Sequence, residues 1–153
     1  MSDEDTDGIF YSGSYTKPLD DKRRLTLPSK WRFKGDDGES SYLAIPMKYG
    51  AITVLPPDMV KNLRRTISKI TMANPLKRAA ISEFLSKADS FGCDKQGRIV
   101  LSDTLVGYAK LGKEAYLVGV GASFEIWNPQ RRKQWIGEIG AGVGDSVLEE
   151  LGI

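Results

Sequence analysis

Two short segments of this chain place an acidic residue four positions before an arginine, with further cations between them. The first reads Asp20-Asp21-Lys22-Arg23-Arg24, and the second, seventy-four positions later, reads Asp94-Lys95-Gln96-Gly97-Arg98. Each is followed at once by an apolar residue, Leu25 or Ile99. A charged stretch between apolar runs is typical of a tight turn between strands. We therefore expect two basic turns, which are compatible with binding to a polyanion.

The duplicated turns indicate that the chain repeats one unit of secondary structure. The first copy is expected to run strand, turn, strand, short helix, two strands and helix, over residues 9–19, 24–27, 28–33, 42–45, 51–55 and from 56 onward. The second copy is expected to use 88–93 and 97–101 as a hairpin, then a short helix at 103–110, strands at 114–120 and 123–127, and a helix at 129–139. Composition predicts a loop at 35–41.

Two helices form an insert between the copies, one starting after Pro56 and the other at Asn74. Apolar residues recur on one face of the first helix. They are Val60, Leu63, Ile67 and Ile70. The cations of this helix lie mostly off that face, and we interpret them as solvated. They are Lys61, Arg64, Arg65 and Lys69.

The repeat divides the chain into five segments. We expect a disordered acidic tail at 1–8, a first repeat at 9–73, a connecting helix at 74–87, a second repeat at 88–139 and a C-terminal tail at 140–153. This last tail is expected to hold a flexible break at 140–144 and a last turn of helix at 145–151. Either half alone would leave strand edges unpaired, and two interlocked halves would cover them. We therefore predict an α+β domain with pseudosymmetric halves and its two turns side by side. In its final helix, Trp135, Ile136 and Ile139 are expected to face inward.

The composition argues against catalysis and against a membrane location. The 153 residues include no histidine and one cysteine, Cys93, and no pair of acids stands out as a catalytic site. The commonest general base and metal ligand is thus absent, and Cys93 is interpreted as a small buried apolar residue. No apolar run approaches the roughly 18–20 residues of a membrane span, and the acidic start is unlike a signal peptide. We expect a cytoplasmic protein that is not an enzyme, with no metal, cofactor, small-molecule substrate or membrane partner.

Several segments resemble the MraZ family of bacterial transcriptional regulators. The matching residues are Gly13-Ser14-Tyr15, the segment 19–28 with the first turn, Asp94 with Gly97-Arg98-Ile99, Leu117-Val118-Gly119-Val120-Gly121 and Phe124-Glu125-Ile126-Trp127. The resemblance implies two pseudosymmetric AbrB-like repeats of the swapped-hairpin, double-split β-barrel type, with flanking helices. It also implies sequence-specific binding to double-stranded DNA, at direct repeats in the promoter of the cell-division and cell-wall gene cluster, by a ring-shaped homo-oligomer associated with the nucleoid.

The resemblance further implies which residues contact the DNA. Lys22 and Arg24 of the first turn and Arg98 of the second carry over as contacts, and the neighbouring cations Arg23 and Lys95 are added to them. Arginine can bind the O6 and N7 atoms of guanine with two hydrogen bonds, while lysine typically meets phosphate. For Arg98, a capping or ion-pair role inside the protein is an open alternative.

Three further residues are interpreted as structural parts of the turns: Asp20, Asp94 and Gly97. Each acid is expected to accept hydrogen bonds from turn N–H groups or to orient the arginine that follows. The first turn departs from the family pattern, because Arg23 stands where the family has glycine. If φ is positive there, a residue other than glycine costs on the order of 1 kcal/mol. Either the turn has another shape, or the strain is tolerated for a third cation.

Two other functions stay open. One is an oligomeric protein-interaction scaffold that has lost DNA binding, which the replaced glycine favours. The other is an antitoxin-like module of the same fold. Loss of affinity with rising salt would separate a DNA-binding protein from a scaffold.

Overall fold

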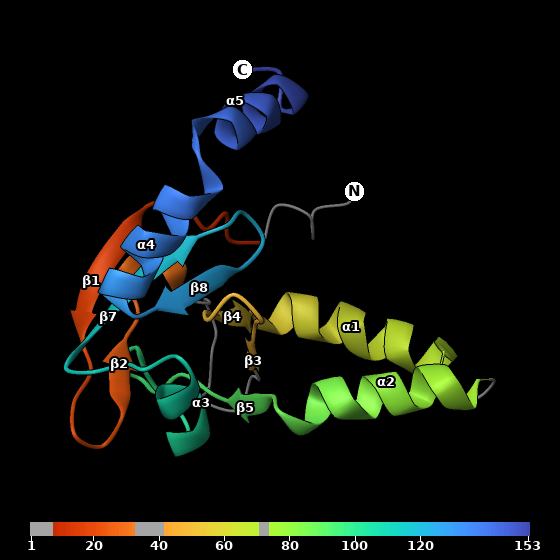
Figure 1. Ribbon diagram of the computed structural model, residues 1–153. Helices are drawn as coiled ribbons and strands as arrows, with labels where there is room; N and C mark the ends of the chain where they lie inside the picture. Colours follow the sequence, from red (N-terminus) through yellow and green to blue (C-terminus); the bar gives the residue numbers. More distant parts are fainter. Residues whose placement is uncertain (1–7, 33–41, 71–73) are drawn as a thin grey trace.

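The structure is a computed structural model that describes residues 8–32, 42–70 and 74–153 (Figure 1). The predicted loop at 35–41 lies outside these ranges, and so does the predicted disordered tail apart from Gly8. The described residues form two antiparallel sheets and several helices, an α+β architecture as predicted. No helix within these ranges is both long and apolar enough to cross a membrane.

The larger sheet holds six strands in the order β1-β7-β8-β4-β3-β5. Their bounds are Ser14–Pro18 (β1), Tyr42–Pro46 (β3), Ile52–Leu55 (β4), Asp89–Phe91 (β5), Glu114–Gly119 (β7) and Phe124–Trp127 (β8). The strands β1, β3 and β4 of the first half correspond to β5, β7 and β8 of the second. When each strand is replaced by its counterpart, the same order results, read from the opposite edge of the sheet. The first strand of each half pairs with the other half, β1 with β7 and β5 with β3. The halves therefore interlock and cover each other's strand edges.

The smaller sheet is a two-stranded ribbon of β2 (Arg24–Thr26) and β6 (Arg98–Val100). The strands pair antiparallel with Leu25 opposite Ile99 at the centre. Both of these side chains are fully buried. Because successive side chains of a strand point to opposite faces, the residues on either side of them lie on the outer face of the ribbon.

The hairpin predicted for 88–93 and 97–101 does not form. β5 pairs with β3 in the larger sheet, whereas β6 pairs with β2, so the strands on either side of the second turn belong to different sheets. Around the first turn, β1 likewise pairs with β7, and the bridge Leu19–Leu25 is the contact to β2. Pairing across the halves places Leu25 directly against Ile99 in the core. This cross-strand contact stabilises the fold, and a local hairpin would not form it.

The helices are α1 (Pro57–Ile70), α2 (Pro75–Ser86), α3 (Asp103–Tyr108), α4 (Pro129–Ile139), α5 (Ala141–Glu150) and a 3-10 helix at Ser29–Trp31. Asn74 and Asn128 cap α2 and α4, each accepting two backbone N–H groups, with proline at the first helical position. The Ser102 hydroxyl accepts the Leu105 N–H at the start of α3. These starts follow the sequence signals on which the helices were predicted.

One apolar cluster joins both sheets to the 3-10 helix. Trp31 is fully buried, and its ring packs against Tyr11, Tyr15 and Phe124 at centroid distances of 5.6, 5.2 and 5.0 Å. Cys93 is buried in the same cluster, as its interpretation as a small apolar residue requires. This cluster fixes the inner face of the ribbon and so sets the direction of its outer face.

Two expectations at the periphery are wrong. The predicted flexible break at 140–144 is helical from Ala141 onward, because Gly142 and Gly144 cost only about 1 kcal/mol each in a helix. Ile136 is 47% exposed instead of facing inward. Trp135 and Ile139, expected inward with it, are half-buried, and the ring of Trp135 stacks on Tyr49 at 5.3 Å.

Candidate nucleic-acid interface

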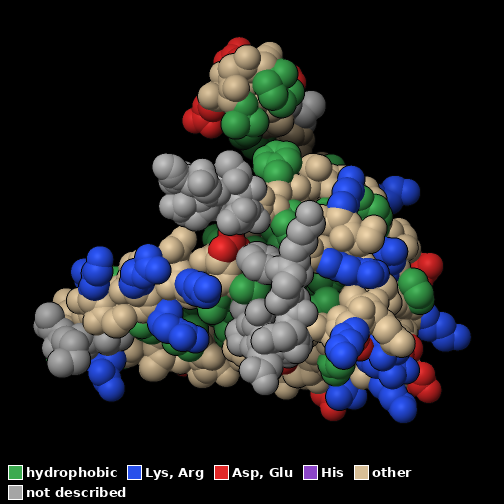
Figure 2. All heavy atoms as spheres, turned by 180° about the vertical axis from the view of Figure 1, so that it is seen from behind, with side chains coloured by type: hydrophobic (Ala, Val, Ile, Leu, Met, Phe, Trp, Pro, Cys, Tyr) green, Lys and Arg blue, Asp and Glu red, His purple; other side chains and the backbone are tan. Residues whose placement is uncertain are grey.

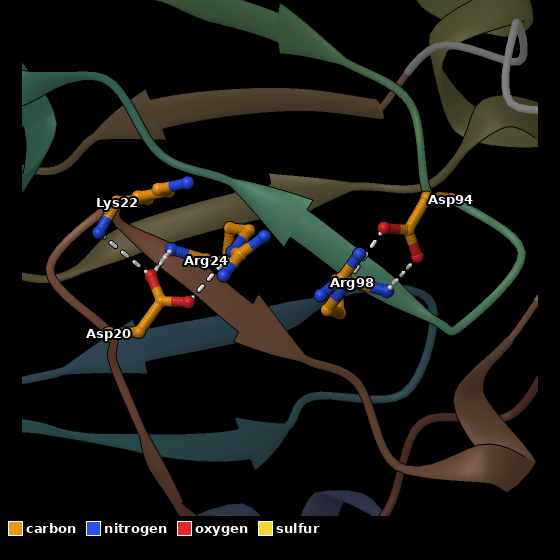
Figure 3. A network of polar contacts seen from close by, with 5 residues as sticks. All are labelled: Asp20, Lys22, Arg24, Asp94 and Arg98. Atoms are coloured by element: carbon orange, nitrogen blue, oxygen red, sulfur yellow. Dashed lines mark hydrogen bonds and ion pairs between the residues drawn. The ribbon is translucent and has the colours of Figure 1, made fainter.

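The first turn is shaped by the carboxylate of Asp20 (Figure 3). Its Oδ1 accepts the backbone N–H groups of Lys22 at 2.9 Å and Arg24 at 2.8 Å, and its Oδ2 accepts the Nε–H of Arg24 at 2.7 Å. The Arg23 N–H donates to the Asp20 carbonyl at 2.9 Å. One side chain thus closes the turn and fixes the arginine that follows it.

The second turn repeats this geometry. Asp94 Oδ1 accepts the N–H groups of Gln96 and Arg98, both at 2.9 Å, and Asp94 Oδ2 accepts the Nε–H of Arg98 at 2.9 Å. The Gly97 N–H donates to the Asp94 carbonyl, also at 2.9 Å. The two halves therefore hold Arg24 and Arg98 in the same way. Arg98 makes an ion pair inside the protein, as its alternative interpretation had it, and remains part of the exposed surface.

These hydrogen bonds lower the pKa of both turn carboxyl groups below the ordinary value. For Asp20 the largest cause is the backbone N–H of Arg24, followed by the guanidinium of that residue. For Asp94 the largest cause is the backbone N–H of Arg98, with the guanidinium adding to it. Both carboxylates are charged at neutral pH, so each arginine keeps its partner there.

The residue before each arginine has a positive φ, 61° at Arg23 and 81° at Gly97. The first turn therefore keeps the shape of the second although it lacks the glycine. The turn therefore does not adopt another shape, and the backbone strain at Arg23 is tolerated. A left-handed residue with a Cβ costs roughly 1–2 kcal/mol.

Arg23 is held against the second half of the protein. Its Nε donates to the Leu101 carbonyl at 2.9 Å, and its Nη1 lies 3.2 Å from Oδ1 of Asp103. Leu101 directly follows β6, and Asp103 is the first residue of α3. The guanidinium thus ties the first turn to the end of the ribbon strand from the other half, and these contacts offset part of the backbone strain.

Arg32 takes the equivalent place at the second turn. Its Nε and Nη2 donate to the Leu27 carbonyl at 3.3 and 3.1 Å, and a Cβ on Gly97 would lie 2.1 Å from its Nε. Leu27 in the first half corresponds to Leu101 in the second. The carbonyl that follows each ribbon strand therefore accepts hydrogen bonds from a guanidinium. The donor is Arg23 for Leu101 and Arg32 for Leu27, so the two arginines do not occupy equivalent sequence positions.

The outer face of the ribbon brings the two turn arginines together. Arg24 lies opposite Val100 and Arg98 lies opposite Thr26, so the arginines occupy diagonal positions, which are roughly 7–8 Å apart on paired strands. Their side chains are 34% and 33% exposed. The carboxylates bind the Nε edge of each guanidinium, which leaves the terminal nitrogens for a ligand as far as the described residues show.

The turns themselves do not lie side by side, contrary to expectation. Antiparallel pairing places them at opposite ends of the ribbon (Figure 3). The ribbon is only three residue pairs long, about 7 Å between its first and last pair. Its cations therefore form one short strip, with Lys22 at one end, the arginines between and Lys95 at the other end. Both lysines are exposed, and no ion pair joins either to another described residue.

Sequence reasoning missed two residues of this region: Arg32 and Asp103. Arg32 and Asp103 act on residues of the turns or on the carbonyls next to them, and nothing in the local sequence marks them. The offset of seventy-four positions aligns Leu27 with Leu101, but it does not reveal which arginine reaches either carbonyl.

Comparison with known proteins adds an independent observation. A family model described as "MraZ protein, putative antitoxin-like" matches residues 84–141, a range that contains the second turn and β6. The first half is outside this match, but relatives extend the similarity over most of the chain.

Three of these relatives are each named "Transcriptional regulator MraZ". That of Bifidobacterium longum is 31% identical over 91% of this chain and 93% of its own length. That of Mycolicibacterium smegmatis is 34% identical over 82% of this chain and 86% of its own length. That of Mycobacterium bovis is 35% identical over 79% of this chain and 82% of its own length.

Proposed function

This chain belongs to the MraZ family, and we propose that it regulates transcription by binding double-stranded DNA with the outer face of the β2–β6 ribbon. The observation that carries this proposal is the pair of arginines on that face, each held through Nε by the aspartate of its own turn. The names of the relatives support the regulatory role. The geometry supports the location of the contact.

The proposed contact follows from the shape of the strip. The major groove of B-DNA admits a two-stranded β-ribbon, and arginine is the side chain that most often reads guanine there. Arg24 and Arg98 would present their terminal nitrogens to base edges, because Nε is already bound. Lys22 and Lys95, at the two ends, would meet phosphates. Arg23 would add charge nearby while it holds the first turn to Leu101.

The interlocked halves support a more specific fold proposal. We propose that the chain consists of two AbrB-like repeats of the swapped-hairpin, double-split barrel type. The exchange of β1 and β5 between the halves supports this, and so does the chain's passage from one sheet to the other at each turn. In this arrangement the ribbon is the place where both repeats meet the DNA.

We also propose that the DNA targets are direct repeats in the promoter of the cell-division and cell-wall gene cluster, bound in the cytoplasm at the nucleoid by a ring-shaped homo-oligomer. One strip offers few cations, so a single copy would bind weakly. Several copies joined in a ring would gain affinity on repeated sites through effective concentration. An oligomer and direct repeats therefore support each other in this proposal.

The test is footprinting of the full chain on the DNA upstream of its own gene, followed by titrations of the protected fragment across a salt series. We expect protection at spaced repeats and an affinity that falls steeply with salt, because each phosphate contact releases counterions. A shuffled fragment of equal length is the control. Assembly without protection of any upstream sequence would contradict DNA binding and favour the protein-interaction scaffold.

A further inference from the structure

The paired helices α1 and α2 project from the sheet (Figure 1), and several of their apolar side chains are exposed among the described residues. Between them and β3 lies a groove of about 400 Å³. Its lining is mostly apolar, with one cation at the edge: Leu43, Val60, Leu63, Arg64, Ile67, Ser68 and Leu85. Leu85 and Phe84 remain 37% and 42% exposed, and Leu76 is 83% exposed. A helix pair with this much uncovered apolar surface is typical of an interaction site.

The helix α1, which forms one wall of the groove, is basic. The exposed side of α1 carries four cations, and α1 has a single acid, Asp58. The four are Lys61, Arg64, Arg65 and Lys69. Figure 2 shows Lys and Arg side chains along the projecting helix pair, with apolar side chains between them. Of these four cations, Arg64 lines the groove itself.

The helix α5 has the complementary character. It stands away from the sheet, far from α1 and α2 (Figure 1). Val143, Val147 and Leu151 recur every four residues and are 55, 44 and 66% exposed, and Leu148 beside them is 46% exposed. The charges of α5 are all negative: Asp145, Glu149 and Glu150. Figure 2 shows apolar and acidic side chains on this helix.

We infer that α5 of one copy of this chain docks in the α1–α2 groove of a second copy. The apolar stripe of α5 would fill the groove, and the net negative charge of α5 would be attracted to the net positive charge of α1. The lengths agree, because ten helical residues span about 15 Å and the fourteen of α1 span about 21 Å. Exposed apolar surface and opposite charge thus coincide on both partners, and this favours a second copy over nucleic acid as the occupant.

This contact joins two different surfaces, so it is head-to-tail and can repeat from copy to copy. A closed series of such contacts is a ring. The inference therefore rests on the self-association proposed above and names the surfaces that carry it. It does not depend on DNA binding, because the ribbon takes no part in it.

The test uses two variants of the full chain and measures mass by light scattering. Val147→Glu with Leu151→Glu damages the stripe of α5, and Leu63→Glu with Ile67→Glu damages the groove. None of the four side chains is buried, so both variants are expected to fold, which circular dichroism checks. We expect each variant alone to lose the assembly of the parent chain. The control Ser146→Glu adds the same acid on the polar side of α5 and should keep it.

Mixing the two variants gives the sharper result. The mixture still contains one intact groove and one intact α5, so we expect a one-to-one pair and nothing larger. An α5 variant with the parent mass, or a mixture that stays unpaired, would overturn the α5 contact while leaving self-association standing. A parent chain that is itself monomeric would overturn both. Docking of α5 into the groove of its own chain predicts no pairing and would likewise overturn the inference.

Discussion

At the scale of single residues, the two turns use one acid to prepare one cation. Asp20 and Asp94 each satisfy two backbone N–H groups and hold the Nε of the arginine that follows. An arginine whose orientation is fixed in advance loses less conformational freedom on binding than a free one. In the proposed DNA contact the acids would therefore contribute to recognition, although they carry the same sign of charge as DNA.

The lowered pKa of these acids makes the stability of the turns depend on pH. A carboxyl group with a lowered folded-state pKa stabilises the fold above its ordinary pKa, about 3.9, and loses this contribution as the pH falls through the lowered value. We expect Asp20→Asn with Asp94→Asn to be less stable than the parent at neutral pH. Urea unfolding from about pH 6 to about pH 2.5 should show the difference shrinking below pH 4. A difference that stays constant across this range would contradict the account.

Arg23 offers a second prediction, because strain and contacts oppose each other there. Arg23→Gly removes the left-handed strain and also the bonds to Leu101 and Asp103, whereas Arg23→Ala removes the bonds but keeps the strain. We expect the glycine variant to be more stable than the alanine variant by about 1 kcal/mol. Chemical denaturation of the two variants measures this. Equal stabilities would mean that the first turn relaxes to another shape when the guanidinium is lost.

At the scale of elements, the positions of the helices and strands were predicted from the sequence better than the pairing of the strands. The span of α4 was predicted at 129–139 and is observed there, because Asn128, Pro129 and the following Gly140 mark its ends locally. The pairing of β2 with β6 has no such local mark. A strand carries no record in its own residues of which distant edge it covers, so the second turn was predicted as a simple hairpin.

The same reason explains the remaining errors in the candidate site. The cations of the turns could be predicted from their repetition, and so could the structural acids that precede them. The bond from Arg23 to the Leu101 carbonyl could not, because it spans 78 positions and depends on the exchange of strands between the halves. For α5, the three glycines within residues 140–144 led to a predicted break there, so the helix was expected to start at Asp145 and not at Ala141.

At the scale of the whole molecule, different regions carry different kinds of contact. The ribbon presents a strip of cations held by turn acids. The α1–α2 pair and α5 present apolar surfaces away from the strip. The helices α1 and α5 that carry these surfaces have opposite net charges. Under the two proposals above, the chain would assemble with one set of surfaces and bind DNA with another. Repeated copies would then offer repeated strips to repeated sites.

Base reading by the ribbon arginines can be separated from their charge in one binding experiment. Arg24→Lys with Arg98→Lys keeps both charges but removes the two-pronged hydrogen bonding of guanidinium to guanine. Arg65→Lys with Arg78→Lys, on the exposed sides of α1 and α2, is the matched control. Affinities for the footprinted fragment and a shuffled fragment are compared at one salt concentration. We predict that the ribbon variant loses its preference for the footprinted fragment by about tenfold or more, while its affinity for shuffled DNA and the preference of the control stay near the parent values. A ribbon variant that keeps the full preference would contradict the account.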